Sequence, residues 1–238
     1  METVISILEI IGIISFSAAG AMVAIEKEAD LFGVLFLSLI TCFGGGILRD
    51  ILVGESIGRP IPWVFSGADD ANLYLIIALV SSALVFFAAM LFKKQYVREE
   101  RSVVAINNIL DAIGIGVFAA MGTASCVEMG PFVAITMGMV SAVFGGLTRD
   151  IILRDIPFIL RKYVYAVATI IGSAVYYLTV SVVMPGNDAA RAVGAILCTL
   201  TVFVIRILAT AFRLNLPKAI RFSEKNSENE EKRDLLLK

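Results

Sequence analysis

Long apolar runs separated by short polar segments make up almost the whole chain. Each run is close to the ~20 residues that a helix needs to cross the hydrocarbon core of a bilayer. We therefore expect an all-α integral membrane protein with seven transmembrane helices. The predicted spans are Val4–Ile25, Leu31–Leu48, Asn72–Phe92, Val103–Val127, Phe132–Leu153, Tyr163–Met184 and Ala189–Phe212.

The composition supports this class and excludes several others. Of the 238 residues, 58% are hydrophobic and 17% are charged, and the mean hydropathy is +0.88, which is too apolar for an ordinary soluble domain. The chain has no histidine, which removes His-based metal sites, Ser-His-Asp triads and histidine proton relays. Because no nucleophile–base arrangement or cofactor motif stands out either, we expect no enzyme, no cofactor and no resident metal. The formal net charge of −1 gives no sign of a nucleic-acid partner.

The loops between the spans differ in charge. With seven spans the two ends of the chain lie on opposite sides of the membrane, and most loop lysines and arginines fall on the side of the C-terminus. The opposite face of the membrane has only Arg59 and Arg191. Cytoplasmic loops are enriched in basic residues, so we expect the N-terminus outside and the C-terminus in the cytoplasm.

The sequence contains an internal repeat. The segment EIIGIISFSAAG (Glu9–Gly20) aligns without gaps on DAIGIGVFAAMG (Asp111–Gly122), and FGGGILRD, ending at Asp50, corresponds to FGGLTRD, ending at Asp150. The predicted units are a three-helix repeat at 1–92, a second repeat at 93–184, a seventh helix at 185–212, and a charged cytoplasmic tail at 213–238 that we expect to be disordered. An odd number of spans per repeat makes the second copy enter the membrane from the opposite side, so the repeats are predicted to be inverted.

The glycine clusters in spans two and five are unusual because glycine weakens a helix by roughly 0.8–1 kcal/mol relative to alanine. We expect these spans to kink or unwind there, with freed carbonyl oxygens facing a permeating ion. The alternative is that the glycines only permit close helix packing. The candidate kink residues are Gly44, Gly45, Gly46, Gly145 and Gly146.

Charged residues inside the spans are candidates for a path through the bundle, because such residues normally face its interior and pair there. Topology places Glu9 near Arg49 at one end and Asp111 near Arg149 at the other, so two symmetry-related ion pairs, acting as struts and gates, are predicted. Alternatively, both arginines snorkel to the interface and pair with the neighbouring Asp50 and Asp150. Arg206, in the seventh span, has no repeat counterpart and is expected to snorkel toward the cytoplasm.

Hydroxyl side chains in the spans are candidates for the lining of such a path. Each hydroxyl has the alternative of bonding its own helix backbone. The candidates are Ser15, Ser17, Thr41, Thr136, Ser141 and Thr148.

The duplicated glycine-Arg-Asp motifs on spans two and five, with three spans, three related spans and a seventh, resemble the bacterial branch of the trimeric intracellular cation (TRIC) channel family. Some members of the broader family are also described as glycine transporters. The resemblance covers about Val4 to Phe212. It implies a homotrimer in a bacterial inner (plasma) membrane, in which each protomer has its own pore for monovalent cations, chiefly potassium. In such proteins the kinked second and fifth helices shape the pore; here Phe144 replaces the first glycine of the second cluster, which implies a weaker kink there.

Two functions therefore remain open. The first is a passive cation channel, which the resemblance favours. The second is a secondary transporter of a small zwitterion such as glycine, with Glu9 or Asp111 coupled to an ion, because inverted repeats with broken helices are common among transporters.

Overall fold

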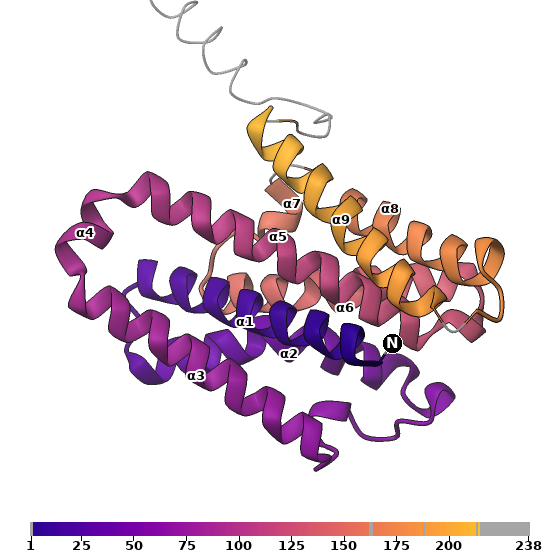
Figure 1. The fold of residues 1–238 in the computed structure, drawn as a ribbon. Coiled ribbons are helices and arrows are strands. Elements are labelled where there is room, and N and C mark those ends of the chain that lie inside the picture. Colours follow the sequence, from indigo (N-terminus) through magenta and orange to yellow (C-terminus); the bar gives the residue numbers. More distant parts are fainter. Residues whose placement is uncertain (1, 162–163, 188, 213, 215–238) are drawn as a thin grey trace, which may run out of the picture.

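The computed structural model describes residues 2–161, 164–187, 189–212 and 214 (Figure 1). Within them all regular secondary structure is helical, and seven helices are long and apolar enough to cross a membrane. This confirms the predicted fold class of an all-helical membrane protein. Apart from Leu214, the tail that we predict to be disordered lies outside the described residues.

The N-terminal part has three long helices, one short helix and two short 3₁₀ turns. Those turns lie in the loop that joins α2 to α3. The elements are α1 (Glu2–Glu26), α2 (Leu31–Val53), the turns η1 (Glu55–Ile57) and η2 (Trp63–Phe65), α3 (Asp69–Leu91) and α4 (Lys93–Arg98).

The rest of the chain has three further long helices and then a last one. The elements are α5 (Glu100–Ser125), the turn η3 (Val127–Met129), α6 (Pro131–Ile152), α7 (Phe158–Arg161), α8 (Tyr165–Leu178), one π-helical turn η4 (Thr179–Val183) and α9 (Ala190–Ala211). In Figure 1, α4 lies at the left edge, where it joins α3 to α5, whereas α8 and α9 lie toward the upper right.

The second long helix differs most from its prediction. We expected a span ending at Leu48 and interrupted at the glycines, but α2 is one continuous α-helix from Leu31 to Val53. α6 likewise runs through its glycines. The prediction of unwound backbone at the glycine clusters is therefore wrong, and tertiary packing has overridden the low helix propensity of glycine.

The packing that keeps these helices continuous lies where α2 crosses α6. A Cβ atom on Gly45 would collide with the backbone carbonyl oxygen of Ser141, and one on Gly145 would collide with the carbonyl oxygen of Thr41. A Cβ atom on Gly44 would lie 3.2 Å from the Cα of Gly145. Small residues let membrane helices approach in this way, so three of the five cluster glycines are explained by close packing.

The outer surface of the bundle is apolar. Leu84 and Leu91 on α3, Phe32 on α2 and Phe132 on α6 are all more than half exposed. The fully buried positions, in contrast, include many alanines, such as Ala19 and Ala120. Large apolar residues outside and small ones inside are the arrangement expected of helices that face lipid and pack closely on one another.

Candidate functional site

The end of α2 holds a buried ion pair. Arg49 contacts the Asp50 carboxylate through Nη2, at 2.6 Å, and through Nε, at 2.8 Å, both to Oδ1. The other carboxylate oxygen of Asp50, Oδ2, accepts a hydrogen bond from the backbone N–H of Trp63 at 2.9 Å. Asp50 therefore neutralises the arginine and also fixes the loop between α2 and α3.

The end of α6 repeats this arrangement. Arg149 contacts Oδ1 of Asp150 at 2.8 Å, and Oδ2 accepts a hydrogen bond from the backbone N–H of Phe158 at 3.0 Å. Arg49 is only 7% exposed and Arg149 only 2%. The arginines are thus bonded to the next residue in the chain, as in our alternative, but they are buried and do not snorkel.

The predicted pairs Glu9–Arg49 and Asp111–Arg149 are wrong. Each arginine is already paired with a neighbour on its own helix. The backbone N–H of Trp63 holds the Asp50 carboxylate beside Arg49, and Glu9 accepts its hydrogen bond from Tyr74 instead.

The two other carboxylates accept hydrogen bonds from tyrosines. The Tyr74 hydroxyl on α3 donates to Oε2 of Glu9 at 2.8 Å, and the Tyr165 hydroxyl on α8 donates to Oδ1 of Asp111 at 3.1 Å. Neither tyrosine was predicted from the sequence to belong to the site. A signal was present, because Tyr74 and Tyr165 are as far apart in the chain as Ser82 and Ser173, which occupy matching places in spans three and six.

The prediction for Arg206, which lies on α9, is also wrong. Its guanidinium Nη2 donates to Oδ2 of Asp111 at 3.0 Å, and its Cζ lies 4.2 Å from the centre of the Tyr165 ring. The residue is only 4% exposed, so it does not snorkel toward the cytoplasm as predicted. The negative carboxylate and the aromatic face both favour the buried cation.

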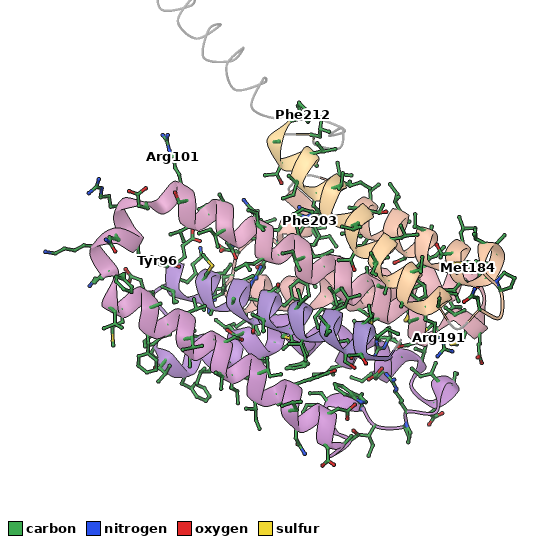
Figure 2. All side chains as sticks on the ribbon, viewed as in Figure 1. Tyr96, Arg101, Met184, Arg191, Phe203 and Phe212 are labelled. Carbon is green, nitrogen blue, oxygen red and sulfur yellow. The ribbon has the colours of Figure 1, made fainter. Side chains whose placement is uncertain are left out.

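A first cavity of about 350 Å³ lies at the end of the molecule where α1 begins and α2 ends. The predicted site residues Gly46, Glu9, Arg49 and Asp50 line it together. Figure 2 shows Arg191, another lining residue, near the N-terminal end of α1. The charged lining residues that the sequence analysis did not assign to a site are Arg59, Asp70 and Arg191.

A second, much smaller cavity of about 20 Å³ lies among α5, α6, α8 and α9. It contains two of the predicted charges, Asp111 and Arg149; Asp150 is bonded to Arg149 but does not line it. The other lining residues are Asn107, Asn108, Phe158, Tyr165 and Arg206.

An apolar layer lies between the two cavities along α5, from Asp111 in the second cavity to Val117 and Phe118 in the first. The rings of Phe16 and Phe118 stack with centroids 5.1 Å apart, and Ile115 is fully buried. Such a layer obstructs ions, because apolar walls offer no replacement for their hydration shell.

The six candidate hydroxyls line neither of these two cavities. Ser17, Thr41 and Thr148 donate hydrogen bonds to carbonyl oxygens of their own helices, at Ile13, Leu37 and Phe144. Ser15 and Ser141 are buried, and Thr136 is half-buried. Their pore-lining role stays a prediction.

The sequence matches the Glycine transporter family model over residues 6–90 and 108–181. The chain belongs to the Glycine transporter family. Related members include the UPF0126 inner membrane protein YadS of Escherichia coli K12, which is 35% identical over 216 residues, covering 88% of this chain and 93% of YadS. The UPF0126 membrane protein YvgT of Bacillus subtilis is 32% identical over 213 residues, covering 89% of this chain and 94% of YvgT.

The chain also resembles solved structures of TRIC channels. A prokaryotic TRIC channel crystallised in 0.5 M KCl matches with a TM-score of 0.74 and 27% identity, over 91% of this chain and all (100%) of that one. The TRIC orthologue from Rhodobacter sphaeroides matches with a TM-score of 0.71 and 29% identity, over 89% of this chain and 100% of the orthologue. The fold is thus that of prokaryotic TRIC channels, which confirms the resemblance noted in the sequence.

Membership in a Glycine transporter family with the TRIC fold also confirms that the chain is not an enzyme, since these are channels and transporters. It is an integral membrane protein with an inner-membrane relative in Escherichia coli.

Proposed function

We propose that the protein is a potassium-permeable channel for monovalent cations, with a pore within each protomer of a homotrimer. The observation that carries this proposal is the likeness to prokaryotic TRIC cation channels over about nine-tenths of the chain. The R. sphaeroides protein is described as trimeric and as a cation channel, and both properties come to this chain through that likeness.

In this proposal the path runs from the first cavity, past the apolar layer at Phe16 and Phe118, to the second cavity. It follows the crossing of α2 and α6, and Gly46 borders it at the first cavity. Opening would require a bend of α2 and α6 at their glycine clusters, so that Gly44, Gly45, Gly46, Gly145 and Gly146 act as hinges.

The inverted repeat is part of the same proposal. Two matching sets of contacts support it: Arg49–Asp50–Trp63 corresponds to Arg149–Asp150–Phe158, and Glu9–Tyr74 corresponds to Asp111–Tyr165. Equivalent contacts at the two ends of one bundle are what a pseudo-two-fold axis in the membrane plane would produce.

The charges of the path would then have distinct roles. Because each pore arginine is bonded to an aspartate, its positive charge is largely compensated and a cation can pass. Glu9 and Asp111 would attract cations at the two mouths. The N-terminus would lie outside and the C-terminus in the cytoplasm, in the inner membrane of a bacterium.

A second candidate function is transport of a small zwitterion such as glycine. Besides the Arg49–Asp50 pair, the first cavity contains the carboxylates of Glu9 and Asp70 and the guanidinium groups of Arg59 and Arg191. Carboxylates can bind an ammonium group and arginines a carboxylate group, so this charge pattern suits a zwitterion, as the family name suggests.

Recording from the purified protein in planar bilayers with asymmetric KCl separates the two functions. Discrete single-channel steps with a reversal potential near that of potassium would support the channel. Absence of steps, together with saturable glycine uptake into vesicles of the same protein, would reject the channel in favour of the transporter.

A further inference from the structure

The second cavity already contains a cation that belongs to the chain. The Arg206 guanidinium lies against the Asp111 carboxylate and over the Tyr165 ring, from a helix outside the two repeats. A carboxylate combined with an aromatic face is a general recognition site for cations. Arg206 therefore occupies the position that a permeating cation would take at this mouth.

The first cavity has a matching carboxylate and tyrosine, but none of the arginines that line it is bonded to that carboxylate in the part of the chain that the structure describes. Glu9 accepts a hydrogen bond from Tyr74, and among the described residues no lysine or arginine forms an ion pair with it. The cavity at Glu9 measures about 350 Å³, whereas the cavity at Asp111 measures about 20 Å³. The occupied site is thus the closed one.

The hydrogen bonding around Arg206 is incomplete. Its Nε atom and the Oδ1 atom of Asn107 are both buried without a hydrogen-bond partner among the described residues, and both residues line the second cavity. A buried network that is only partly satisfied is held less rigidly than a fully satisfied one.

A larger cavity borders this one at Asn107. Asn107 lines a third, larger cavity of about 620 Å³ between the ends of α1 and α3 and the start of α5. Tyr96 lines that cavity as well, and Figure 2 shows it at the opposite end of the molecule from Arg191. A cation leaving the second cavity past Asn107 would therefore enter the third cavity and reach this end.

We propose that Arg206 is a tethered cation that closes the second mouth of the path and must leave Asp111 before a monovalent cation can bind there. This inference rests on the proposed channel function. Arg149 does not replace Arg206 in this role, because Asp150 already binds it through both Nε and Nη2.

The first test is the current of the full-length Arg206→Ala variant in planar bilayers. We expect a several-fold higher open probability than in the wild type, and we expect millimolar guanidinium chloride to block the variant more strongly than the wild type, because free guanidinium can occupy the vacated site. Arg101→Gln, which removes an exposed positive charge at the start of α5, is the matched control and should conduct like the wild type. A folded Arg206→Ala variant with unchanged current and no added guanidinium block would overturn the proposal.

The second test does not depend on conduction. Asn108→Cys places a thiol in the second cavity, and its rate of reaction with a membrane-impermeant, positively charged methanethiosulfonate is measured with and without Arg206→Ala, each against the parent protein with its native cysteines. We expect several-fold faster reaction when Arg206 is absent. Faster reaction without current in either protein would retain the closure by Arg206 and reject the channel, whereas equal rates would reject the closure.

If Arg206→Ala alone fails to fold, the double variant Arg206→Ala/Asp111→Asn removes both charges together. It should fold. Its Asn108→Cys form should react several-fold faster than Asn108→Cys in the protein that retains Arg206. A folded double variant that reacts at the wild-type rate would equally overturn the proposal.

Discussion

Tyr74 donates a hydrogen bond to Glu9 across 65 positions of the chain, at 2.8 Å, and so joins α3 to α1 at the first cavity. Tyr165 does the same for Asp111 at the second. In each half, this bond joins the first long helix to the third, and its acceptor is a carboxylate. Their repetition indicates that the carboxylate–tyrosine pair is part of the basic construction of each half.

Removal of either hydroxyl should therefore destabilise the bundle. A hydrogen bond to a charged group contributes about 1.5–3 kcal/mol, and we expect Tyr74→Phe and Tyr165→Phe each to lower the free energy of unfolding by that order. Tyr177→Phe is the control, because Tyr177 has no hydrogen-bond partner among the described residues. Thermal unfolding in detergent measures the effect. Equal melting temperatures for all three variants would show that the two bonds contribute nothing.

The Arg49–Asp50 pair should be strongly coupled. Asp50→Asn leaves a buried guanidinium without its counter-charge, which typically costs about 3–5 kcal/mol. The double variant Asp50→Asn/Arg49→Gln should recover part of this loss. A double-mutant cycle on thermal stability measures the coupling.

The same cycle distinguishes the observed pair from the one that the sequence suggested. Glu9→Gln should be nearly additive with Arg49→Gln. Strong coupling of Glu9 to Arg49, with weak coupling of Asp50 to Arg49, would contradict the pairing seen in the structure.

The glycines at the helix crossing should differ sharply from their neighbour. Gly45→Ala and Gly145→Ala would force α2 and α6 apart, because the new Cβ collides with a backbone carbonyl that cannot move alone; overpacking of this kind typically costs about 1–3 kcal/mol or more. Gly46→Ala has no atom within 4 Å of the new Cβ and should fold with unchanged or slightly higher stability. Melting temperatures and elution volumes compare the three variants, and a stable Gly45→Ala protein together with an unstable Gly46→Ala protein would refute the crossing.

The exposed ion pair between Lys27 and Asp155, 2.7 Å apart, should show the pH dependence of a lysine. The hydrogen bond that the Lys27 ammonium donates to the Asp155 carboxylate raises the pKa of Lys27 above its ordinary value of 10.5. The contribution of the pair is then fully present below that value and is lost as the pH rises through the raised pKa. Lys27→Met should cause a small loss of stability that is constant from neutral to mildly alkaline pH.

Salt provides the control for this pair, because surface ion pairs are screened. The difference between wild type and Lys27→Met should shrink at high NaCl concentration in thermal unfolding. A difference that grows with salt would exclude an electrostatic origin.

The sequence was sufficient to predict the seven helices, because each needs only a long apolar run, and these runs leave little choice of structure. The internal repeat also singled out residues that lie together in the structure: Glu9 and Arg49 line one cavity, and Asp111 and Arg149 line the other. What the sequence could not provide was the choice of partner. Asp50 and Glu9 were both available to Arg49, and the decision depends on where the loop N–H of Trp63 lies.

The prediction of a helix break at the glycines failed for a related reason. Low propensity at Gly44–Gly46 predicts a break, but propensity describes an isolated helix, whereas here the carbonyl of Ser141 occupies the space that a side chain would need. Arg206 was misplaced because a helix without a repeat counterpart has no internal template, and its contact with Asp111 joins positions 95 residues apart.

The double role of Asp50 has an electrical consequence. One of its oxygens neutralises Arg49 while the other anchors the loop at Trp63, so the loop and the local field cannot change independently. If the loop pulls Asp50 away, a positive charge is exposed in the first cavity, and at an effective dielectric constant of 20 it would repel a cation ~4 Å away by about 4 kcal/mol. In the proposed channel, a movement of this loop would thereby change the electric field that a cation meets in the first cavity.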